Sequence, residues 1–218
     1  MSKTALVIGT TGLVGSHLVQ ELLVNEEYST VKVFVRRATG ISHPKLQEFI
    51  CNFNRLDEIA ENIKGDVLYS AMGTTLKQAG SKENQYEVDF TYQYEFARLA
   101  ADNDVKEYIL VSSVSANARS KAFYLRIKGE LEEAVKNLDF EKIIILQPSG
   151  LMGQRDNKRK REVIGIAMMN AIIRVLPGLK KYRGIKGATV AKAMVNLAKK
   201  SFNEKAITIR LDEIFEYA

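Results

Sequence analysis

Residues 9–17 of the chain read Gly9-Thr10-Thr11-Gly12-Leu13-Val14-Gly15-Ser16-His17, a glycine-rich turn with the spacing G-x-x-G-x-x-G. The turn follows the apolar run 4–8, and it opens a stretch, 13–24, whose apolar residues recur at helical spacing. A turn between a buried strand and a helix gathers unpaired backbone N–H groups at the positive end of the helix dipole. Such a point binds phosphate without any charged side chain, so the stretch predicts a nucleotide site.

Each glycine of the turn has a separate expected role. Gly9 permits the tight turn, Gly12 lets the backbone approach a pyrophosphate, and Gly15 lets the helix pack closely on the strand. The spacing between the first two glycines is one residue longer than in the usual dinucleotide fingerprint. The position of the turn, between a strand and a helix, therefore carries more weight than the glycines alone.

The rest of the chain alternates between strand-like and helix-like segments. Strands are expected at 4–8, 31–35, 49–53, 66–71, 107–111, 142–146 and 206–210, and helices at 13–24, 56–63, 86–103, 123–136, 163–176 and 188–200. This alternation predicts an α/β fold, a Rossmann-type doubly wound parallel sheet with helices on both faces. The carboxyl ends of its strands would line one ligand-binding crevice.

The totals are those of an ordinary soluble globular protein. We expect 1–218 to be a single domain, with a dinucleotide-binding core at 1–150 and a small substrate-side lobe at 151–218. The lone Cys51 excludes an intrachain disulfide, and the two histidines give no metal-binding cluster. With no signal peptide or segment long enough to span a bilayer in the sequence, we expect a cytoplasmic protein.

The end of the second strand bears on which dinucleotide is bound. In this fold an acidic residue there accepts a hydrogen bond from the ribose of NAD, whereas arginine accommodates the 2′-phosphate of NADP. The chain has Arg36 and Arg37 at this point and no acidic residue in 31–46, which favours NADP(H) over NAD(H). Asn52 and Phe53 follow the third strand, near the expected adenine, where Asn52 could bind the adenine edge or cap the turn.

Tyr124 and Lys128 lie four residues apart, on one face of a predicted helix. A neighbouring ammonium favours the phenolate and suits tyrosine to acid–base work, while a serine hydroxyl holds a substrate carbonyl. Tyr28/Lys32 and Tyr182/Lys186 have the same spacing, but only Tyr124/Lys128 follows a strand that ends in serines. Of those serines we assign Ser113 to the substrate and place Ser112 nearer the cofactor.

Together, the glycine turn, Ser112-Ser113 and Tyr124-x-x-x-Lys128 resemble the extended and atypical short-chain dehydrogenases/reductases. Within that family, four further segments resemble the Tat-interacting-protein group of NADPH-binding members; they are 72–75, 79–81, 88–89 and 124–130. The resemblance runs in order from residue 4 to about 150.

The resemblance implies NADP(H) bound along the strand tips and a catalytic triad of Ser113, Tyr124 and Lys128. Tyr124 would be the general acid/base, and Lys128 would lower its pKa and hold the nicotinamide ribose. The implied cofactor-binding residues are Gly9, Thr11, Gly12, Leu13, Val14, Arg36, Arg37, Asn52, Phe53, Ala71, Met72, Gly73, Thr74, Ser112, Tyr124, Lys128 and Pro148. Gln147 departs from the arginine typical of the group, and Asn52 departs from its aspartate.

Two functions follow as hypotheses. The first is an NADP(H)-dependent oxidoreductase that acts on a small carbonyl or alcohol. The alternative is a non-catalytic NADPH-binding redox sensor or regulator that acts through a protein partner. The basic run 155–161 precedes the apolar stretch 163–176, whose thin polar side predicts burial against the sheet or a second subunit of a homodimer, not attachment to a membrane surface. No aromatic residue interleaves that run, so we expect no nucleic-acid binding.

Overall fold

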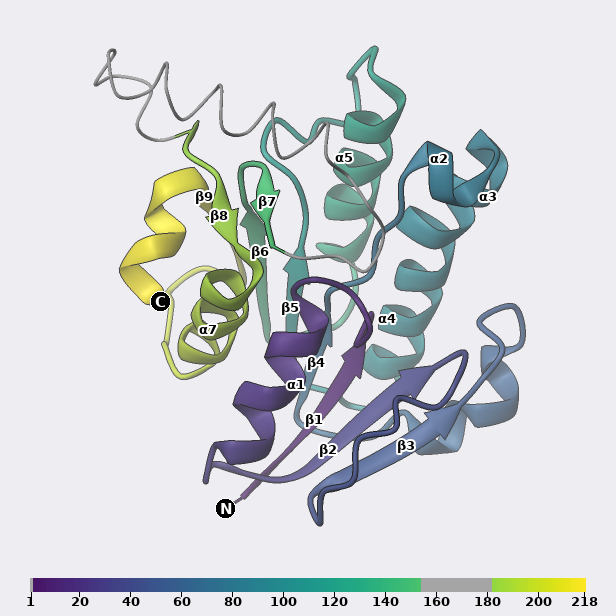
Figure 1. Cartoon of the computed structure of the whole chain (residues 1–218), viewed down its shortest axis with the longest axis vertical. Helices are drawn as coiled ribbons and strands as arrows, with labels where there is room; N and C mark the ends of the chain where they lie inside the picture. The colour runs from purple at the N-terminus through teal and green to yellow at the C-terminus, as the bar shows by residue number, and fades with distance from the viewer. Residues whose placement is uncertain (1, 154–181) are drawn as a thin grey trace.

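The computed structural model describes residues 2–153 and 182–218 (Figure 1). Its centre is a seven-stranded parallel sheet in the order β3-β2-β1-β4-β5-β6-β9. The strands are β1 (Lys3–Ile8), β2 (Tyr28–Val35), β3 (Leu46–Ile50), β4 (Val67–Ser70), β5 (Glu107–Val111), β6 (Lys142–Gln147) and β9 (Ala206–Arg210). The strand order reverses between β1 and β4, and in such sheets ligands bind at the reversal point.

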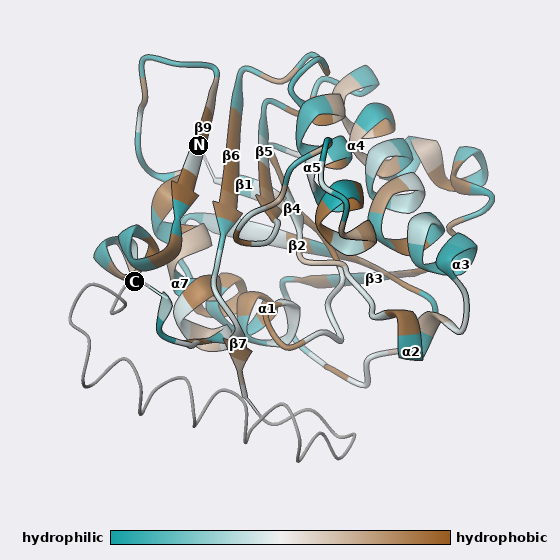
Figure 2. Cartoon of the chain, turned by 90° about the horizontal axis from the view of Figure 1, so that it is seen from above, coloured by the Kyte–Doolittle hydropathy of each residue, from teal (hydrophilic) through white to brown (hydrophobic). Residues whose placement is uncertain are grey.

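Helices cover both faces of the sheet, which confirms the predicted doubly wound α/β fold (Figure 2). One face carries α1 (Gly15–Val24) and α7 (Gly187–Ala198), which pack against each other. The other carries α4 (Tyr92–Asp102), α5 (Phe123–Val135) and the 3₁₀ helix η1 (Leu56–Asn62). A second 3₁₀ helix, η4 (Leu211–Tyr217), follows β9 and packs against α7.

The sheet forms because its strands are short apolar runs that supply both helical layers with side chains. In β1, Ala5 and Val7 point into the core under α1 and α7, whereas Leu6 and Ile8 point into the core under α4 and α5. All four are completely buried. Burial on both faces is the usual condition of parallel strands, and it explains why these segments are continuously apolar.

A π-helical segment shapes the entry to α4. The chain runs through α2 (Leu76–Ala79) and α3 (Lys82–Tyr86) into the π-helix η2 (Glu87–Thr91) and then into α4. The side-chain amide of Gln93 donates to the Val88 carbonyl at 3.2 Å and to the Asp89 carbonyl at 3.0 Å. It thereby supplies partners for backbone groups in the widened turn. The segment leaves the Asp89 side chain completely buried beside the strand tips.

The structure differs from the sequence-based prediction in several elements. The second strand begins at Tyr28 instead of residue 31, and the predicted helix 86–103 is the π-helix η2 followed by α4. The third strand lies at Leu46–Ile50, three residues before the predicted 49–53, because Leu46 pairs with Val31 and Ile50 with Val35. The predicted helix 56–63 is the 3₁₀ helix η1. In the predicted lobe, β9 joins the main sheet and α7 covers it, while β7 (Leu151–Met152) and β8 (Ile185–Lys186) form a separate two-stranded sheet. The predicted helix 163–176 and the basic run 155–161 lie outside the described residues.

Candidate active site

A cavity of about 470 Å³ opens at the carboxyl ends of β1, β4 and β5, where the strand order reverses. This is the position that the fold predicts for a ligand. Its described lining comes from the glycine turn, the β4 tip, α3, the β5 tip, α5 and β7: Gly12, Leu13, Val14, Ala71, Met72, Gly73, Thr74, Thr75, Leu76, Lys82, Gln85, Val111, Ser112, Phe123, Tyr124, Lys128 and Leu151. The glycine turn, the fourth-strand tip and the Tyr/Lys helix therefore converge on one site.

The glycine turn is tight for reasons that the structure makes specific. Gly9 has φ +83°, and a Cβ there would overlap the backbone of Ala71 and Met72 at the β4 tip. A Cβ on Gly15 would overlap the Gly9 carbonyl. The expected roles of Gly9 in the turn and of Gly15 in close packing thus have a direct steric basis.

The start of α1 is open to an anion. No side chain caps the helix, and its first turn contains no acidic residue. The buried Thr10 hydroxyl beside it has no hydrogen-bond partner among the described residues. Uncapped N–H groups and an unsatisfied buried hydroxyl are the features that a bound phosphate would complete.

Tyr124 and Lys128 both reach the cavity from the start of α5, at different depths. Tyr124 is 39% exposed, whereas Lys128 is 2% exposed. Burial lowers the pKa of Lys128, and the negative charges of Asp89 and Glu132 oppose that shift. Burial therefore disfavours the charged form of Lys128, and two carboxylates favour it.

Asp89 is the first of these carboxylates, and the sequence-based site did not include it. Its Oδ1 accepts a hydrogen bond from the Thr74 backbone N–H at 3.2 Å, while its buried Oδ2 has no hydrogen-bond partner in the described part of the chain. Burial raises the pKa of Asp89, and Lys128, the Thr74 N–H and Gln85 counteract the rise. Val88-Asp89 stood out only as a point of family resemblance, because helical periodicity does not reveal an inward turn made by a π-helix.

Glu132 is the second carboxylate, and it lies one turn after Lys128 on α5. The Ser112 hydroxyl donates to Glu132, and the Gln147 amide donates to both Glu132 oxygens at 3.0 Å. Arg210 of β9 in turn donates from Nε to Gln147 Oε1 at 3.3 Å. Gln147, the departure from the resembled group, thus belongs to an internal network, and the signal for Glu132 was its i+4 spacing from Lys128.

The two serines at the β5 tip have different surroundings. Ser112 lines the cavity, whereas Ser113 is not among the described residues that line it. The Ser113 hydroxyl makes a long bond, 3.4 Å, to the carbonyl of Val114. The choice of Ser113 for the substrate therefore depends on the family resemblance, since the geometry brings Ser112 to the cavity.

The expected adenosine end is only partly assembled as predicted. Arg36 and Arg37 are exposed directly after β2, open to a ligand phosphate. The Asn52 side chain accepts from the Asn54 N–H at 3.0 Å, so of the two alternatives for Asn52 the structure shows the turn cap. Phe53 is 6% exposed and its ring packs beside Phe96 in the core, so its contact with the adenine stays a prediction.

Two other residues that were predicted to bind the cofactor differ in their exposure to solvent. Thr11 is exposed on the turn, and Pro148 is buried with its carbonyl accepting from the Val114 N–H at 3.0 Å.

The pair Tyr28/Lys32, which has the same four-residue spacing as Tyr124/Lys128, has a structural role. Tyr28 pairs with the Tyr69 hydroxyl at 2.7 Å, deep in the core, and Lys32 donates to backbone carbonyls.

The described ranges 2–153 and 182–218 hold no cluster of metal-ligating side chains. Within the same ranges, every helix is too short or too polar to cross a membrane.

Comparison with known proteins identifies relatives along nearly the whole chain. The HIM1 family model matches residues 38–181. The mitochondrial protein fmp52 of Aspergillus niger is 34% identical over 212 residues, covering 93% of this chain and 89% of the relative. Its counterpart in Aspergillus fumigatus is 36% identical with the same coverage. The expected cytoplasmic location is therefore wrong, because these relatives are named as mitochondrial proteins.

Solved structures with the same fold are distant in sequence. A UDP-N-acetylglucosamine 4-epimerase from Methanobrevibacter ruminantium superposes with a TM-score of 0.72 at 15% identity, covering 99% of this chain and 80% of the other. WbmG of Bordetella bronchiseptica, solved with NAD, has a TM-score of 0.70 at 13% identity, covering 96% and 72%. At this identity the similarity establishes the Rossmann-type fold alone.

Proposed function

The chain belongs to the HIM1 family, and from that premise and the geometry of the cavity we propose that it is an NADP(H)-dependent oxidoreductase acting on a small carbonyl or alcohol. The observation that carries the proposal is the convergence of Tyr124 and buried Lys128 on one cavity with the glycine turn. A tyrosine and a buried cation beside a nucleotide-binding turn are the parts that reversible proton transfer at a carbonyl oxygen needs.

The residues present fit a dinucleotide. The uncapped start of α1 and the unsatisfied Thr10 hydroxyl suit a diphosphate. Exposed Arg36 and Arg37 suit the 2′-phosphate, which supports NADP(H) over NAD(H). When bound, the nicotinamide supplies hydride to a carbonyl carbon or accepts it from an alcohol carbon.

The protein's own groups would handle the proton. In reduction, Tyr124 gives its phenolic proton to the carbonyl oxygen, which becomes the alcohol; in oxidation, the phenolate takes that proton back. Lys128 stabilises the phenolate, and Asp89 and Glu132 favour the charged form of Lys128. On the family resemblance, the second hydrogen bond to the substrate oxygen is assigned to Ser113, while the Ser112 hydroxyl donates to Glu132.

The test is NADPH oxidation with a panel of small aldehydes and ketones, followed at the nicotinamide absorbance. Wild-type protein is expected to oxidise NADPH with at least one carbonyl, and Tyr124→Phe to lose about 10²–10⁴-fold in kcat. NADPH affinity, measured by calorimetry, is expected to stay within a fewfold in this variant. Wild-type turnover no faster than that of Tyr124→Phe would refute the proposal.

One observation favours the non-catalytic alternative. Gln147 replaces an arginine of the resembled group and is turned into the Glu132 network, so the chain lacks that group's substrate anchor at this position. A regulator would bind NADPH, give no turnover, and change its affinity for a protein partner with cofactor occupancy. As part of this alternative, we propose that the chain is a member of the Tat-interacting-protein group. Because the relatives are named as mitochondrial proteins, a protein partner should be sought in mitochondria.

A further inference from the structure

The described lining of the cavity has an unbalanced charge. It includes two lysines, Lys82 and Lys128, and no aspartate or glutamate. The positive charge of Lys128 is opposed by the negative charges of the buried Asp89 and Glu132. Lys82, in contrast, forms no ion pair with any described residue, and its charge interacts with that of the neighbouring exposed Glu83. Lys82 is therefore the exposed positive charge of the described lining, whereas Lys128 is buried.

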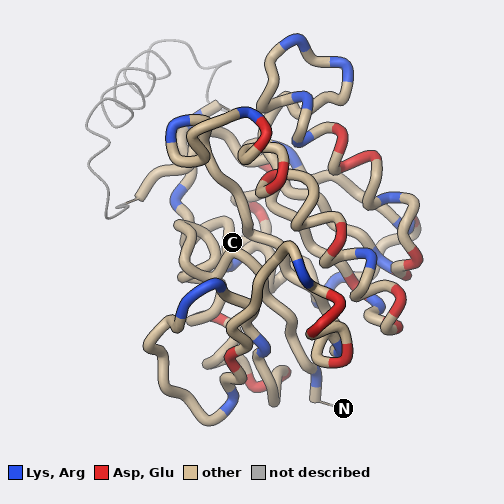
Figure 3. The backbone as a smooth tube through the Cα atoms, turned by 90° about the vertical axis from the view of Figure 1, so that its right-hand side faces the viewer, with Lys and Arg blue, Asp and Glu red and all other residues tan. Residues whose placement is uncertain are grey.

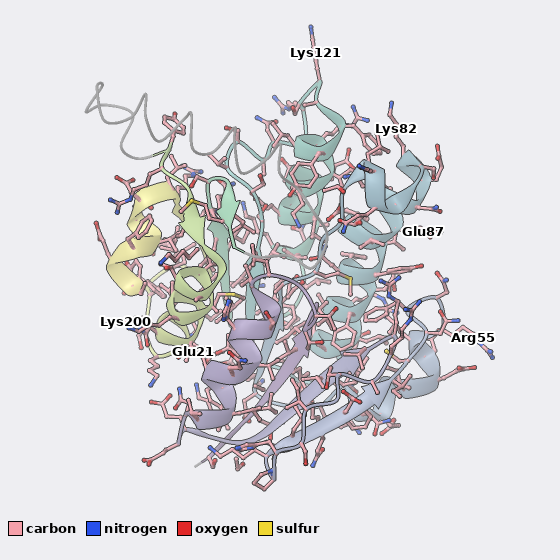
Figure 4. The ribbon with its side chains drawn as sticks, viewed as in Figure 1. Glu21, Arg55, Lys82, Glu87, Lys121 and Lys200 are labelled. Carbon is pink, nitrogen blue, oxygen red and sulfur yellow. The ribbon has the colours of Figure 1, made fainter. Side chains whose placement is uncertain are left out.

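Lys82 is held at the cavity by an aromatic ring. Its Nζ lies over the Phe123 ring at 5.4 Å from the ring centre, and Phe123 directly precedes Tyr124 at the start of α5. A cation over an aromatic face is attracted to the ring, and Lys82 is nevertheless exposed to solvent. Figure 4 shows Lys82 on α3, at the same end of the molecule as Lys121 of the loop before α5. The ammonium thus stands at the edge of the cavity, on the side of Tyr124.

The segments around the mouth carry the same sign of charge. Segments 73–86 and 112–126 contain five basic residues, Lys77, Lys82, Arg119, Lys121 and Arg126, and one acidic residue, Glu83. Arg126 is paired with Glu130 at 3.6 Å, which leaves four basic residues outside that ion pair. The loop before α5 carries basic residues only, and acidic residues recur along the helices below it (Figure 3). The Glu83 side chain is turned back to Ser81 at the start of its own helix. A mouth of one sign attracts ligands of the opposite sign.

We propose that the cavity takes carbonyl compounds that carry a negatively charged group, and that Lys82 binds this group while Tyr124 faces the carbonyl oxygen. The inference rests on the proposed oxidoreductase function and adds a substrate class to it. The anionic group does not react; it fixes which end of the molecule enters first. Because the described lining also includes Leu76, Phe123 and Leu151, an apolar spacer between anion and carbonyl fits the site.

The experiment compares 4-formylbenzoate with its neutral methyl ester, with NADPH, in wild-type protein and in Lys82→Met. Wild type is expected to prefer the carboxylate, and Lys82→Met to lower the ratio of the two kcat/KM values about fivefold, the equivalent of one solvent-exposed ion pair. Lys82→Glu is expected to lower the ratio further. Raised ionic strength is expected to reduce the wild-type preference.

Lys77→Met is the matched control. Lys77 is an exposed lysine on the neighbouring helix α2 and is not among the described residues that line the cavity. This variant removes the same charge from the same region, so an unchanged ratio assigns the effect to Lys82 and not to the general field. An equal fall in both variants would overturn the assignment to Lys82.

A binding arm separates this inference from the proposed function. Benzoate and benzamide are titrated into the NADPH complex of each protein by calorimetry. If neither aldehyde reacts but benzoate binds with an affinity that depends on Lys82, the oxidoreductase proposal fails and the anion site is supported. If both aldehydes react with a ratio that Lys82→Met leaves unchanged, the function stands and the inference is overturned. A rise in the Kd for NADPH in Lys82→Met, with the ratio unchanged, would assign Lys82 to the cofactor and also overturn it.

Discussion

Replacing Gly9 by alanine tests how closely the glycine turn packs on the sheet. Two separate costs are expected. The residue has φ +83°, a conformation that costs a residue with a Cβ about 1–2 kcal/mol. The added Cβ would also overlap the backbone of Ala71 and Met72, and overpacking of this kind costs a further 1–3 kcal/mol or so. We therefore expect Gly9→Ala to lower the free energy of unfolding by roughly 2–5 kcal/mol.

The variant Gly40→Ala distinguishes the cost of the backbone conformation from the cost of overpacking. Gly40 has φ +74°, and nothing lies within 4 Å of a Cβ built on it. Gly40→Ala therefore carries the conformational cost alone, about 1–2 kcal/mol. In a chain of this size each kcal/mol shifts the melting temperature by about 2–4 °C, so thermal and urea unfolding resolve the two variants.

A second measurement connects the turn to the ligand. Calorimetry with NADPH is expected to show weakened or lost binding in Gly9→Ala and unchanged binding in Gly40→Ala, because only the first moves the backbone N–H groups of the turn. Equal destabilisation of the two variants would refute the close approach between the turn and the β4 tip. Normal NADPH binding by Gly9→Ala would refute the role of that turn as the phosphate site.

Three further predictions concern other parts of the site. Replacing both Arg36 and Arg37 by glutamate is expected to raise the Kd for NADPH at least tenfold and spare NADH, measured by calorimetry; equal losses would contradict the 2′-phosphate assignment. Asp89→Asn removes a negative charge that favours the ammonium of Lys128, so the pKa of Lys128 falls. The alkaline limb of the pH profile of kcat/KM is then expected to move to lower pH, and an unmoved limb would contradict this. Phe53→Ala should lower the free energy of unfolding by about 3–5 kcal/mol in urea, with NADPH affinity unchanged because the ring lies in the core; reduced affinity would support the contact of Phe53 with the cofactor.

The composition of short segments was enough to predict strands that are bounded by polar turns. The bounds of β5 and β9 agree with the prediction at both ends, since each is a short apolar or β-branched run between polar turns. Register was beyond such signals. The segment 49–53 reads as a strand by composition, but pairing with β2 sets β3 at Leu46–Ile50 and leaves Phe53 to pack on Phe96, far along the chain.

The candidate site likewise contains residues that the sequence indicated and residues that only the packing of separate elements brings together. The glycine turn and the Tyr124/Lys128 pair are contiguous or one helical turn apart, so the sequence indicated them. Asp89 reaches the site through a π-helical turn stabilised by Gln93, and Ser112 meets Glu132 only because β5 and α5 pack together. Contacts of this kind depend on how separate elements pack, which one sequence does not display.

The position of β9 has a consequence for how the site forms during synthesis. Among the described strands of the main sheet, β9 comes last in the sequence, and Arg210 at its end donates to Gln147, which holds Glu132 beside Ser112. The nucleotide turn also has a partner late in the chain, because Gly187 at the start of α7 lies so close to the Leu13 carbonyl that a Cβ there would overlap it. The phosphate end and the polar network behind Lys128 therefore both depend on segments that follow β6 in the chain.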